Sequence, residues 1–311
     1  MSLLVVSDRT PARAAPGRSR GRPRRRLVGW LFILPLFTVN VLVIAGPAAM
    51  SVAYSFTDWD GLSTPSFIGL DNYTALFGDQ LFRTALWHNL LWTAFFLVVP
   101  MAMGLLGAYL LSQIRRFQML FRLLFFVPYV VATIVASSVW RQLLDPDEGV
   151  LSALNRMGLP VPGDVNFLGN GDLALGSIAV INNWQWWGFL MLLFLSAMQG
   201  VDPSLYEAAR LDGAGKWREF WHVTLPGIRP TFVFLFLMTI IWSFLVFDYV
   251  YILTNGGPAG STEVLSTLLY RSAFGSQQAG YASAIGVVMA LISAVTVSGY
   301  LILRKRMRWD V

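Results

Sequence analysis

The chain has 311 residues, of which 56% are hydrophobic and 13% are charged, and its formal net charge is +6. This apolar fraction exceeds what the core of a soluble protein of this length requires, so the composition predicts an integral membrane protein. Because cysteine is absent and the two histidines lack ligand spacing, disulfides and thiolate metal sites are excluded and we expect no bound metal.

The N-terminal segment is strongly basic. Eight of the 23 Lys and Arg residues lie between Arg9 and Arg26, among Pro, Gly and Ser and without apolar periodicity, so residues 1–26 are predicted to be a disordered tail. Such an arm is one way to bind nucleic acid. Positive charge beside a first membrane span is, however, the ordinary orientation signal, so we expect no nucleic-acid partner. The apolar run that follows exceeds the core of about 7 to 15 residues in a signal peptide, which disfavours cleavage.

Six apolar stretches are long enough to cross the roughly 30 Å of hydrocarbon in a bilayer. They cover residues 28–52, 88–111, 118–140, 176–199, 230–252 and 281–303. The pattern predicts an all-α integral membrane protein with six transmembrane helices, forming one domain over residues 27–311 in contact with membrane lipid. The acidic, aromatic loop between the first two stretches is expected to contain a short amphipathic piece at the interface.

Orientation follows from the basic residues between the stretches. Nineteen of the 23 Lys and Arg residues fall on the side of the N-terminus when the loops are assigned alternately. Cytoplasmic loops carry this excess. We therefore expect a multi-pass membrane protein with both termini and residues 202–226 in the cytoplasm.

The longest strongly polar segment between two spans is residues 202–226. Asp202 before Pro203 is typical of a helix start, and Gly213 is placed to end that helix about three turns later. A second short helix is expected over residues 215–222, before Leu225 and Pro226 close the unit. Isolated helices shorter than about 12 to 15 residues are marginal in water, so the segment is predicted to dock onto a partner.

Three motifs carry a family resemblance. They are FIGLDNY at residues 67–73, EAARLDGAGKWREFWHVTLP at 207–226 and FDYVYILTNGGP at 247–258. The second resembles the EAA loop of ABC importer permeases, in which Val223 replaces the usual isoleucine. All three together resemble the carbohydrate branch, of the maltose and glycerol-phosphate type, and the resemblance covers most of the chain after residue 27.

The resemblance implies a type I ABC importer permease fold in the bacterial inner membrane, with a cytoplasmic EAA coupling loop. It implies that an ATP-binding subunit contacts this loop through Glu207, Ala208, Ala209, Asp212, Gly213, Leu225 and Pro226. It also implies a heterodimer with a second related permease, two ATP-binding subunits and an extracytoplasmic solute-binding protein. The chain itself lacks GxxxxGK[ST], so we expect no cofactor and no catalysis here, with ATP hydrolysed on a partner.

Two groups are candidates for the solute pathway. Asn182, Gln185 and Trp186 lie near the outer end of the fourth stretch, where amides beside aromatic rings suit a neutral polyol. An ordinary interfacial belt of tryptophan is the alternative explanation. Asp248, followed by Tyr249, is the only acidic residue in a predicted span. Two roles are open for Asp248. It is either paired or hydrogen-bonded near the end of its helix, which is a structural role, or it lines the outer part of the pathway.

The predicted function is the permease subunit of an ATP-driven, binding-protein-dependent importer of sugars or related polyols, working by alternating access. The alternative is a stand-alone secondary transporter or channel, which requires ionisable residues inside the membrane or paired broken helices. A membrane enzyme requires a catalytic constellation near a span, and the sequence contains none.

Overall fold

The computed structural model describes residues 23–114 and 116–306, so most of the predicted tail lies outside the described residues. The chain divides into two units at Met50, inside the helix α2. The first contains α1 (Pro23–Asn40), the π-helical turn η1 (Val41–Ala45) and the start of α2 (Gly46–Tyr54). From Phe32 onward this helical stretch is long and apolar enough to span a membrane, and no side chain in its most apolar window is buried. Its surface therefore suits a lipid environment.

The second unit starts at Ser51 with the end of α2. It then contains α3 (Asp71–Gly78), the short helix expected between the first two spans, and α4 (Gln80–Gln113). Asn72 explains part of the FIGLDNY motif. Its buried amide donates to the carbonyls of Ser55, at 2.9 Å, and Thr57, at 2.8 Å, and so fastens α3 to the start of the preceding loop, just after α2.

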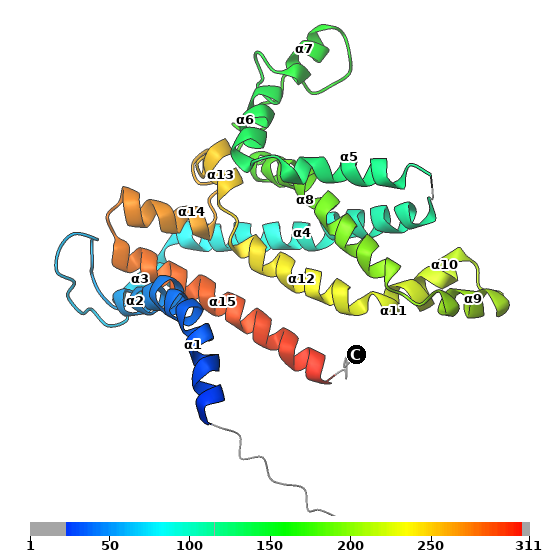
Figure 1. Ribbon diagram of the computed structural model, residues 1–311. Helices are drawn as coiled ribbons and strands as arrows, with labels where there is room; N and C mark the ends of the chain where they lie inside the picture. Colours follow the sequence, from blue (N-terminus) through cyan, green and yellow to red (C-terminus); the bar gives the residue numbers. More distant parts are fainter. Residues whose placement is uncertain (1–22, 115, 307–311) are drawn as a thin grey trace, which may run out of the picture. The chain divides into compact units, whose positions relative to one another are not determined.

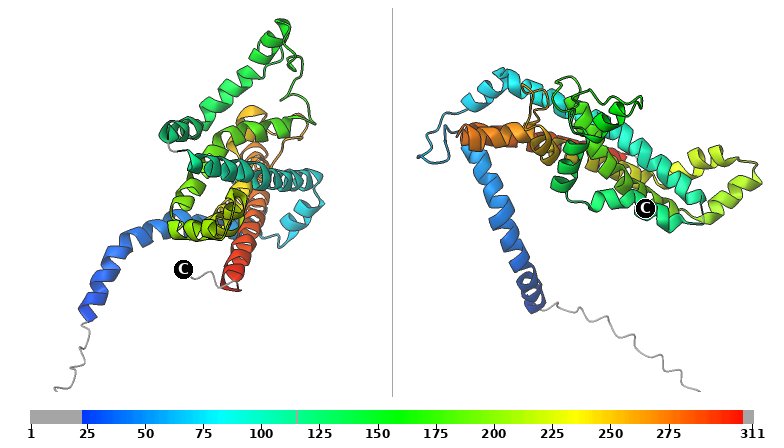
Figure 2. Two further views of the ribbon diagram at one scale, coloured as in Figure 1. Left: turned by 90° about the vertical axis from the view of Figure 1, so that its right-hand side faces the viewer. Right: turned by 90° about the horizontal axis from the view of Figure 1, so that it is seen from above.

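The core of this unit is built around α8 (Ala174–Gln199), which packs against α4 and against α5 (Gln118–Val130). The arrangement is visible in Figure 1 and in the two views of Figure 2. Further helices follow: α6 (Thr133–Leu143), α7 (Val150–Arg156), α12 (Arg229–Phe244), α13 (Asp248–Leu253), α14 (Leu265–Tyr270), the π-helical turn η3 (Arg271–Gly275) and α15 (Ala279–Arg306). Of these, α12 packs on α4 and α15, while α13 packs on α6.

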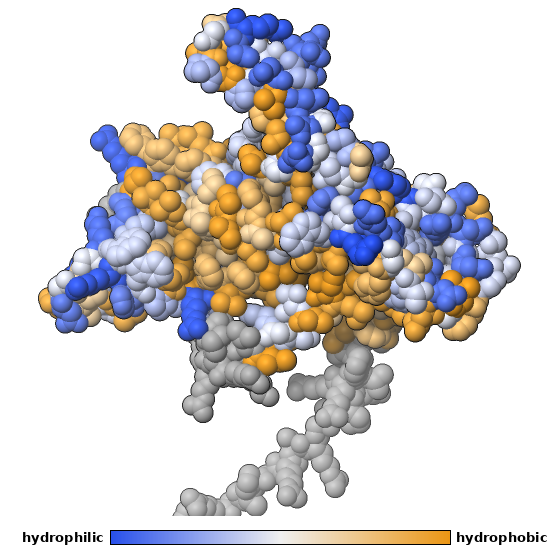
Figure 3. All heavy atoms as spheres, turned by 180° about the vertical axis from the view of Figure 1, so that it is seen from behind, coloured by the Kyte–Doolittle hydropathy of each residue, from blue (hydrophilic) through white to orange (hydrophobic). Residues whose placement is uncertain are grey.

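Five single helices among the described residues are long and apolar enough to cross a membrane, and a bent pair makes six if it counts as one span. This agrees with the six predicted stretches. Seen from the face in Figure 3, apolar side chains dominate the middle of the second unit, and hydrophilic side chains gather towards its ends. This distribution is the one a membrane-spanning bundle requires.

The third predicted span is not a straight helix, which corrects the expectation for residues 118–140. Helices α5 and α6 meet at an angle of 93°. Pro128 lies in the last turn of α5, and Val131 then adopts an extended conformation that ends the helix. Gln185 of α8 donates to the carbonyls of Pro128, at 2.7 Å, and Val131, at 2.8 Å, so backbone groups freed by the bend are satisfied.

Candidate functional site

A helical hairpin, residues 202–226, connects α8 to α12 and lies at the right-hand end of the second unit in Figure 1. Its first helix is α9 (Pro203–Leu211). The Asp202 carboxylate accepts from the backbone N–H of Ser204 at 2.9 Å, and this hydrogen bond lowers the pKa of Asp202. The predicted N-cap, with proline at the first helical position, is confirmed.

Gly213 ends α9 in the left-handed region, at φ +77°. The N–H of Gly213 donates to Arg210 O at 3.0 Å, and that of Ala214 donates to Ala209 O at 2.9 Å. These bonds satisfy carbonyls that a helix end otherwise leaves free. The glycine turn predicted here is therefore present.

The second half of the hairpin is longer than predicted. Helix α10 (Lys216–Glu219) continues into the π-helical turn η2 (Phe220–Thr224) and then α11 (Leu225–Gly227). The expectation that Leu225 and Pro226 close the unit is thus corrected. Leu225 and Pro226 follow directly on the π-helical turn η2 and lie at the start of α11.

Two contacts hold the halves of the hairpin together. Arg210 Nε lies 2.8 Å from Glu219 Oε1, and this hydrogen bond raises the pKa of Arg210. The Tyr206 hydroxyl lies 3.0 Å from the hydroxyl of Thr224. The hairpin is therefore cross-linked by side chains at two levels.

The aromatic residues of the hairpin divide into two groups. Phe220 is buried and packs edge-on against Tyr109 of α4, which fixes the hairpin to that span. Trp217 and Trp221 are 69% and 48% exposed. Glu207 and Ala208 are exposed on α9. The hairpin thus offers a surface of aromatic, small and acidic side chains.

A cavity of about 180 Å³ opens among α4, α8, α12 and α13. Four of the five predicted pathway residues line it, namely Asn182, Trp186, Asp248 and Tyr249. The fifth, Gln185, is buried and holds the bend between α5 and α6 instead. Residues from separate parts of the chain, 182–186 and 248–249, therefore meet at one place.

The cavity also contains residues that sequence reasoning did not select: Trp92, Phe96, Thr239, Trp242 and Ser243. Thr239 and Ser243 are one helical turn apart in an otherwise apolar helix, which is a weak signal for a polar lining. The ring of Trp242 stands edge-on to Trp186 with centroids 4.5 Å apart. The indole N–H of Trp186 is buried without a hydrogen-bond partner among the described residues.

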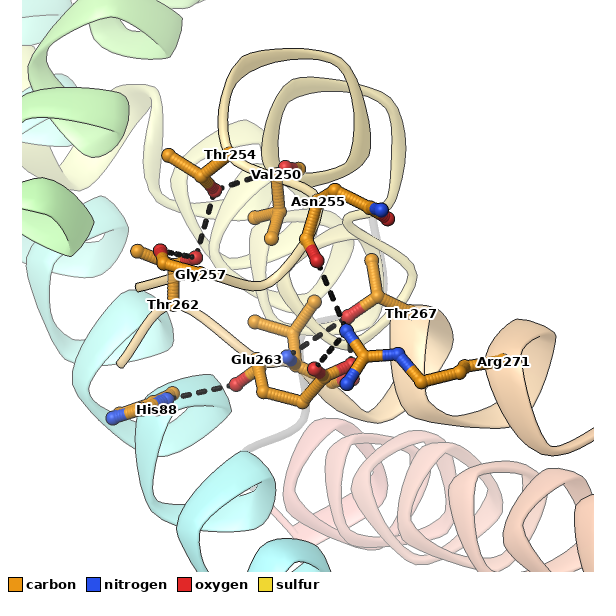
Figure 4. Close-up of polar contacts among 10 residues, drawn as sticks. His88, Val250, Thr254, Asn255, Gly257, Thr262, Glu263, Thr267 and Arg271 are labelled. Atoms are coloured by element: carbon orange, nitrogen blue, oxygen red, sulfur yellow. Dashed lines mark hydrogen bonds and ion pairs between the residues drawn. The ribbon is translucent and has the colours of Figure 1, made fainter. Parts of the chain in front are cut away.

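Helix α12 breaks at residues 245–247 before α13 begins at Asp248, and this break forms part of the cavity wall. Irregular backbone at membrane depth is tolerated where it lines a cavity or is buried in protein. Beyond α13, the loop 254–264 carries a polar network with His88, Glu263 and Arg271, drawn in Figure 4.

These features define a multi-pass helical membrane protein with an aromatic and polar cavity among its spans and a helical hairpin at one end. The chain belongs to the family described as binding-protein-dependent transport system inner membrane component, whose profile matches residues 101–309.

Relatives and a solved structure agree with this assignment. The probable ABC transporter permease protein YurN of Bacillus subtilis is 36% identical over 274 residues, covering 87% of this chain and 93% of the relative. The diacetylchitobiose uptake system permease protein NgcF of Streptomyces coelicolor is 35% identical over 314 residues, covering 94% and 88%. The fold resembles a chain of a bacterial alginate ABC transporter crystallised with its alginate pentasaccharide-bound periplasmic protein. That match has a TM-score of 0.80 at 23% identity and covers 92% of this chain and 97% of the other.

Proposed function

We propose that this protein is the permease subunit of an ATP-driven importer of sugars or related polyols, and that the cavity around Trp186 and Asp248 contacts the solute. The observation that carries the proposal is the convergence of indole rings, an amide, hydroxyls and a carboxylate on one cavity among the spans. Aromatic faces pack on the C–H surfaces of a sugar, while the polar groups bond its hydroxyls. The name of the diacetylchitobiose uptake relative supports a carbohydrate as the transported solute.

The cavity is small for a solute site. At about 180 Å³ it is smaller than the range of about 300 to 1,000 Å³ for small-molecule sites, so it accommodates one sugar ring at most. Family membership implies a second, related permease, and we propose that this subunit completes the pathway as a heterodimer partner. The solute then enters from an extracytoplasmic solute-binding protein.

The hairpin is the proposed contact with the ATPase. Glu207 is exposed on α9, Ala208 and Ala209 permit close approach, and Asp212 and Gly213 form the exposed tip. Leu225 and Pro226 connect this tip to α12, one of the helices that line the cavity. A push on the hairpin is thereby transmitted towards the solute site. We place the hairpin and both termini in the cytoplasm because the basic residues gather on that side.

Reconstitution tests this proposal. The protein is purified from its own host and examined for a copurifying ATPase, then assayed in proteoliposomes for ATP-dependent uptake across a sugar panel. We expect Glu207→Lys and Gly213→Pro to insert normally but to lose ATPase stimulation and uptake together. Uptake that persists without ATP or any ATPase subunit contradicts the proposal and favours a stand-alone transporter.

A further inference from the structure

The wall of the cavity includes a helix that is too short to be stable alone. Helix α13 has six residues and carries Asp248 and Tyr249 into the cavity. A helix of this length gains its position from contacts rather than from its own hydrogen bonds. The loop 254–264 follows α13 directly and contacts its last turn.

The loop closes tightly on the end of α13. The N–H of Asn255 donates to Val250 O at 2.9 Å, and the Thr254 hydroxyl lies 2.7 Å from the Thr262 hydroxyl. Thr262 in turn donates to Gly257 O at 2.8 Å. Figure 4 shows this chain of hydroxyls and carbonyls on one side of the loop. The end of α13 and the loop thus form one hydrogen-bonded unit.

An ion pair fastens this unit to the neighbouring helices. Glu263 Oε2 lies 2.6 Å from Arg271 Nη2 in η3, and the same nitrogen donates to Asn255 O at 2.9 Å. His88 Nδ1 of α4 lies 2.8 Å from Glu263 O. The loop is therefore held on one side by η3 and on the other by α4, as Figure 4 shows.

The backbone packs directly on the ion pair. Gly256 has φ +81°, and a Cβ at this position would lie 2.4 Å from Glu263 Oε2 and 2.7 Å from Arg271 Nη2. Glycine alone fits both the backbone conformation and this approach. A shift of the ion pair therefore displaces the loop backbone as well.

The two partners differ in exposure. The Glu263 side chain is 0% exposed, whereas that of Arg271 is 43% exposed. Burial raises the pKa of Glu263, and the Thr267 hydroxyl, Arg271 and His88 oppose that shift. A buried carboxylate tolerates its charge only with such partners, while a half-exposed guanidinium can be hydrated instead.

We propose that Glu263 and Arg271 are positioning residues that hold α13 where Asp248 and Tyr249 contact the transported solute. This inference rests on the proposed function of the cavity. The ion pair fixes the loop, the loop fixes the end of α13, and α13 presents its side chains to the solute. Because Glu263 is buried and Arg271 is half-exposed, loss of the arginine is expected to impair transport more than loss of the glutamate.

Arg271→Gln leaves a charged carboxylate buried without its cation, so we expect the larger defect there. Glu263→Gln leaves an arginine that water can reach, so its defect is smaller. The double variant Glu263→Gln with Arg271→Gln removes both charges and is expected to recover much of the loss. Arg271→Lys keeps a cation and is expected to transport better than Arg271→Gln.

The experiment uses the whole transporter, purified from its own host with its ATPase and solute-binding protein and placed in proteoliposomes. Radiolabelled diacetylchitobiose and maltose serve as probes, and both uptake and ATP hydrolysis are measured. We expect Arg271→Gln to lower the solute moved per ATP about tenfold, while ATPase stimulation by the binding protein persists. A merely unfolded subunit would lose both activities together.

Acidification gives an independent readout. In Arg271→Gln the buried Glu263 carboxylate loses the guanidinium that it pairs with, so protonation of this carboxyl at low pH removes the unpaired charge. We expect the ratio of solute to ATP in this variant to rise towards wild type as pH falls, and the double variant to show no such dependence. Arg156→Gln, at the exposed end of α7, is the matched control and should behave as wild type.

Three outcomes overturn the proposal: equal ratios in Arg271→Gln and wild type, no recovery in the double variant, or a loss of ATPase stimulation in proportion to uptake. Failure of the proposed function is distinguishable because it shows in the wild type. A wild-type complex that transports no sugar removes the function. A wild-type complex that transports normally beside unaffected variants removes only the positioning role.

Discussion

Arg210 and Glu219 form an ion pair of 2.8 Å that joins the two helices of the hairpin, although they are nine residues apart in the chain. The Arg210 side chain is 65% exposed and that of Glu219 is 11% exposed. The pair spans the turn at Gly213 and therefore fixes the angle at which α9 projects from α10. This ion pair makes the two helices move together, as the proposed transmission of movement from an ATPase requires.

The first prediction tests that cross-link. Glu219→Gln is expected to lower sugar-stimulated ATPase activity several-fold, because α9 can then move without carrying α10 along. Exchange of the partners, Arg210→Glu with Glu219→Arg, should restore part of the stimulation. Arg218→Gln, at an exposed position of α10, is the control. ATPase assays in proteoliposomes measure the effect, and full stimulation in Glu219→Gln would show that the pair is dispensable.

The second prediction concerns the turn. Gly213→Ala forces a residue with a Cβ into φ +77°, at a cost of about 1 to 2 kcal/mol. We expect weaker ATPase binding and reduced stimulation. Gly215→Ala is a close control because both glycines face open space, but only Gly213 has a positive φ. Equal behaviour of the two variants would contradict the requirement for a left-handed residue.

The third prediction separates two residues that lie three positions apart. Gln185→Ala leaves the carbonyls of Pro128 and Val131 without their side-chain donor, which costs about 1 to 3 kcal/mol and should lower the melting temperature of the complex. Gln185→Glu keeps the volume but loses the donor, so it should be no better. Asn182→Ala is expected to alter sugar uptake while the melting temperature stays near wild type. The reverse assignment of the two effects would refute this division.

The fourth prediction concerns a buried amide in α4. Asn89 donates to Ser243 O at 2.9 Å and accepts from the N–H of Leu265 at 2.8 Å, joining α4 to α12 and α14. Asn89→Ala leaves both backbone groups without their side-chain partner, so we expect a loss of about 2 kcal/mol or more in stability. Ser138→Ala removes only a local bond within α6 and is the control. Thermal unfolding of the solubilised protein measures both, and a similar small loss in each would refute the role of Asn89.

The spans, the hairpin and its caps could be predicted because their signals are local. Apolar runs of membrane length, the pair Asp202 and Pro203, and the glycine at position 213 each act within a few residues of their position. The extension of the second hairpin helix through Pro226 was missed because proline is compatible with a first helical turn as well as with a helix stop.

Tertiary structure decided what the separated segments do together. The amide of Gln185 could bind a sugar hydroxyl as well as a backbone carbonyl, so the sequence does not distinguish the two roles. In the folded protein α5 packs against α8, and the amide donates to the backbone at the α5–α6 bend. Trp242 and Trp186 pack edge-on although they lie in different helices. Glu263 likewise pairs with Arg271 of η3. Periodicity and hydropathy describe one helix at a time. The cavity and its supports depend on side chains from several helices, whose spacing is set by packing rather than by sequence separation.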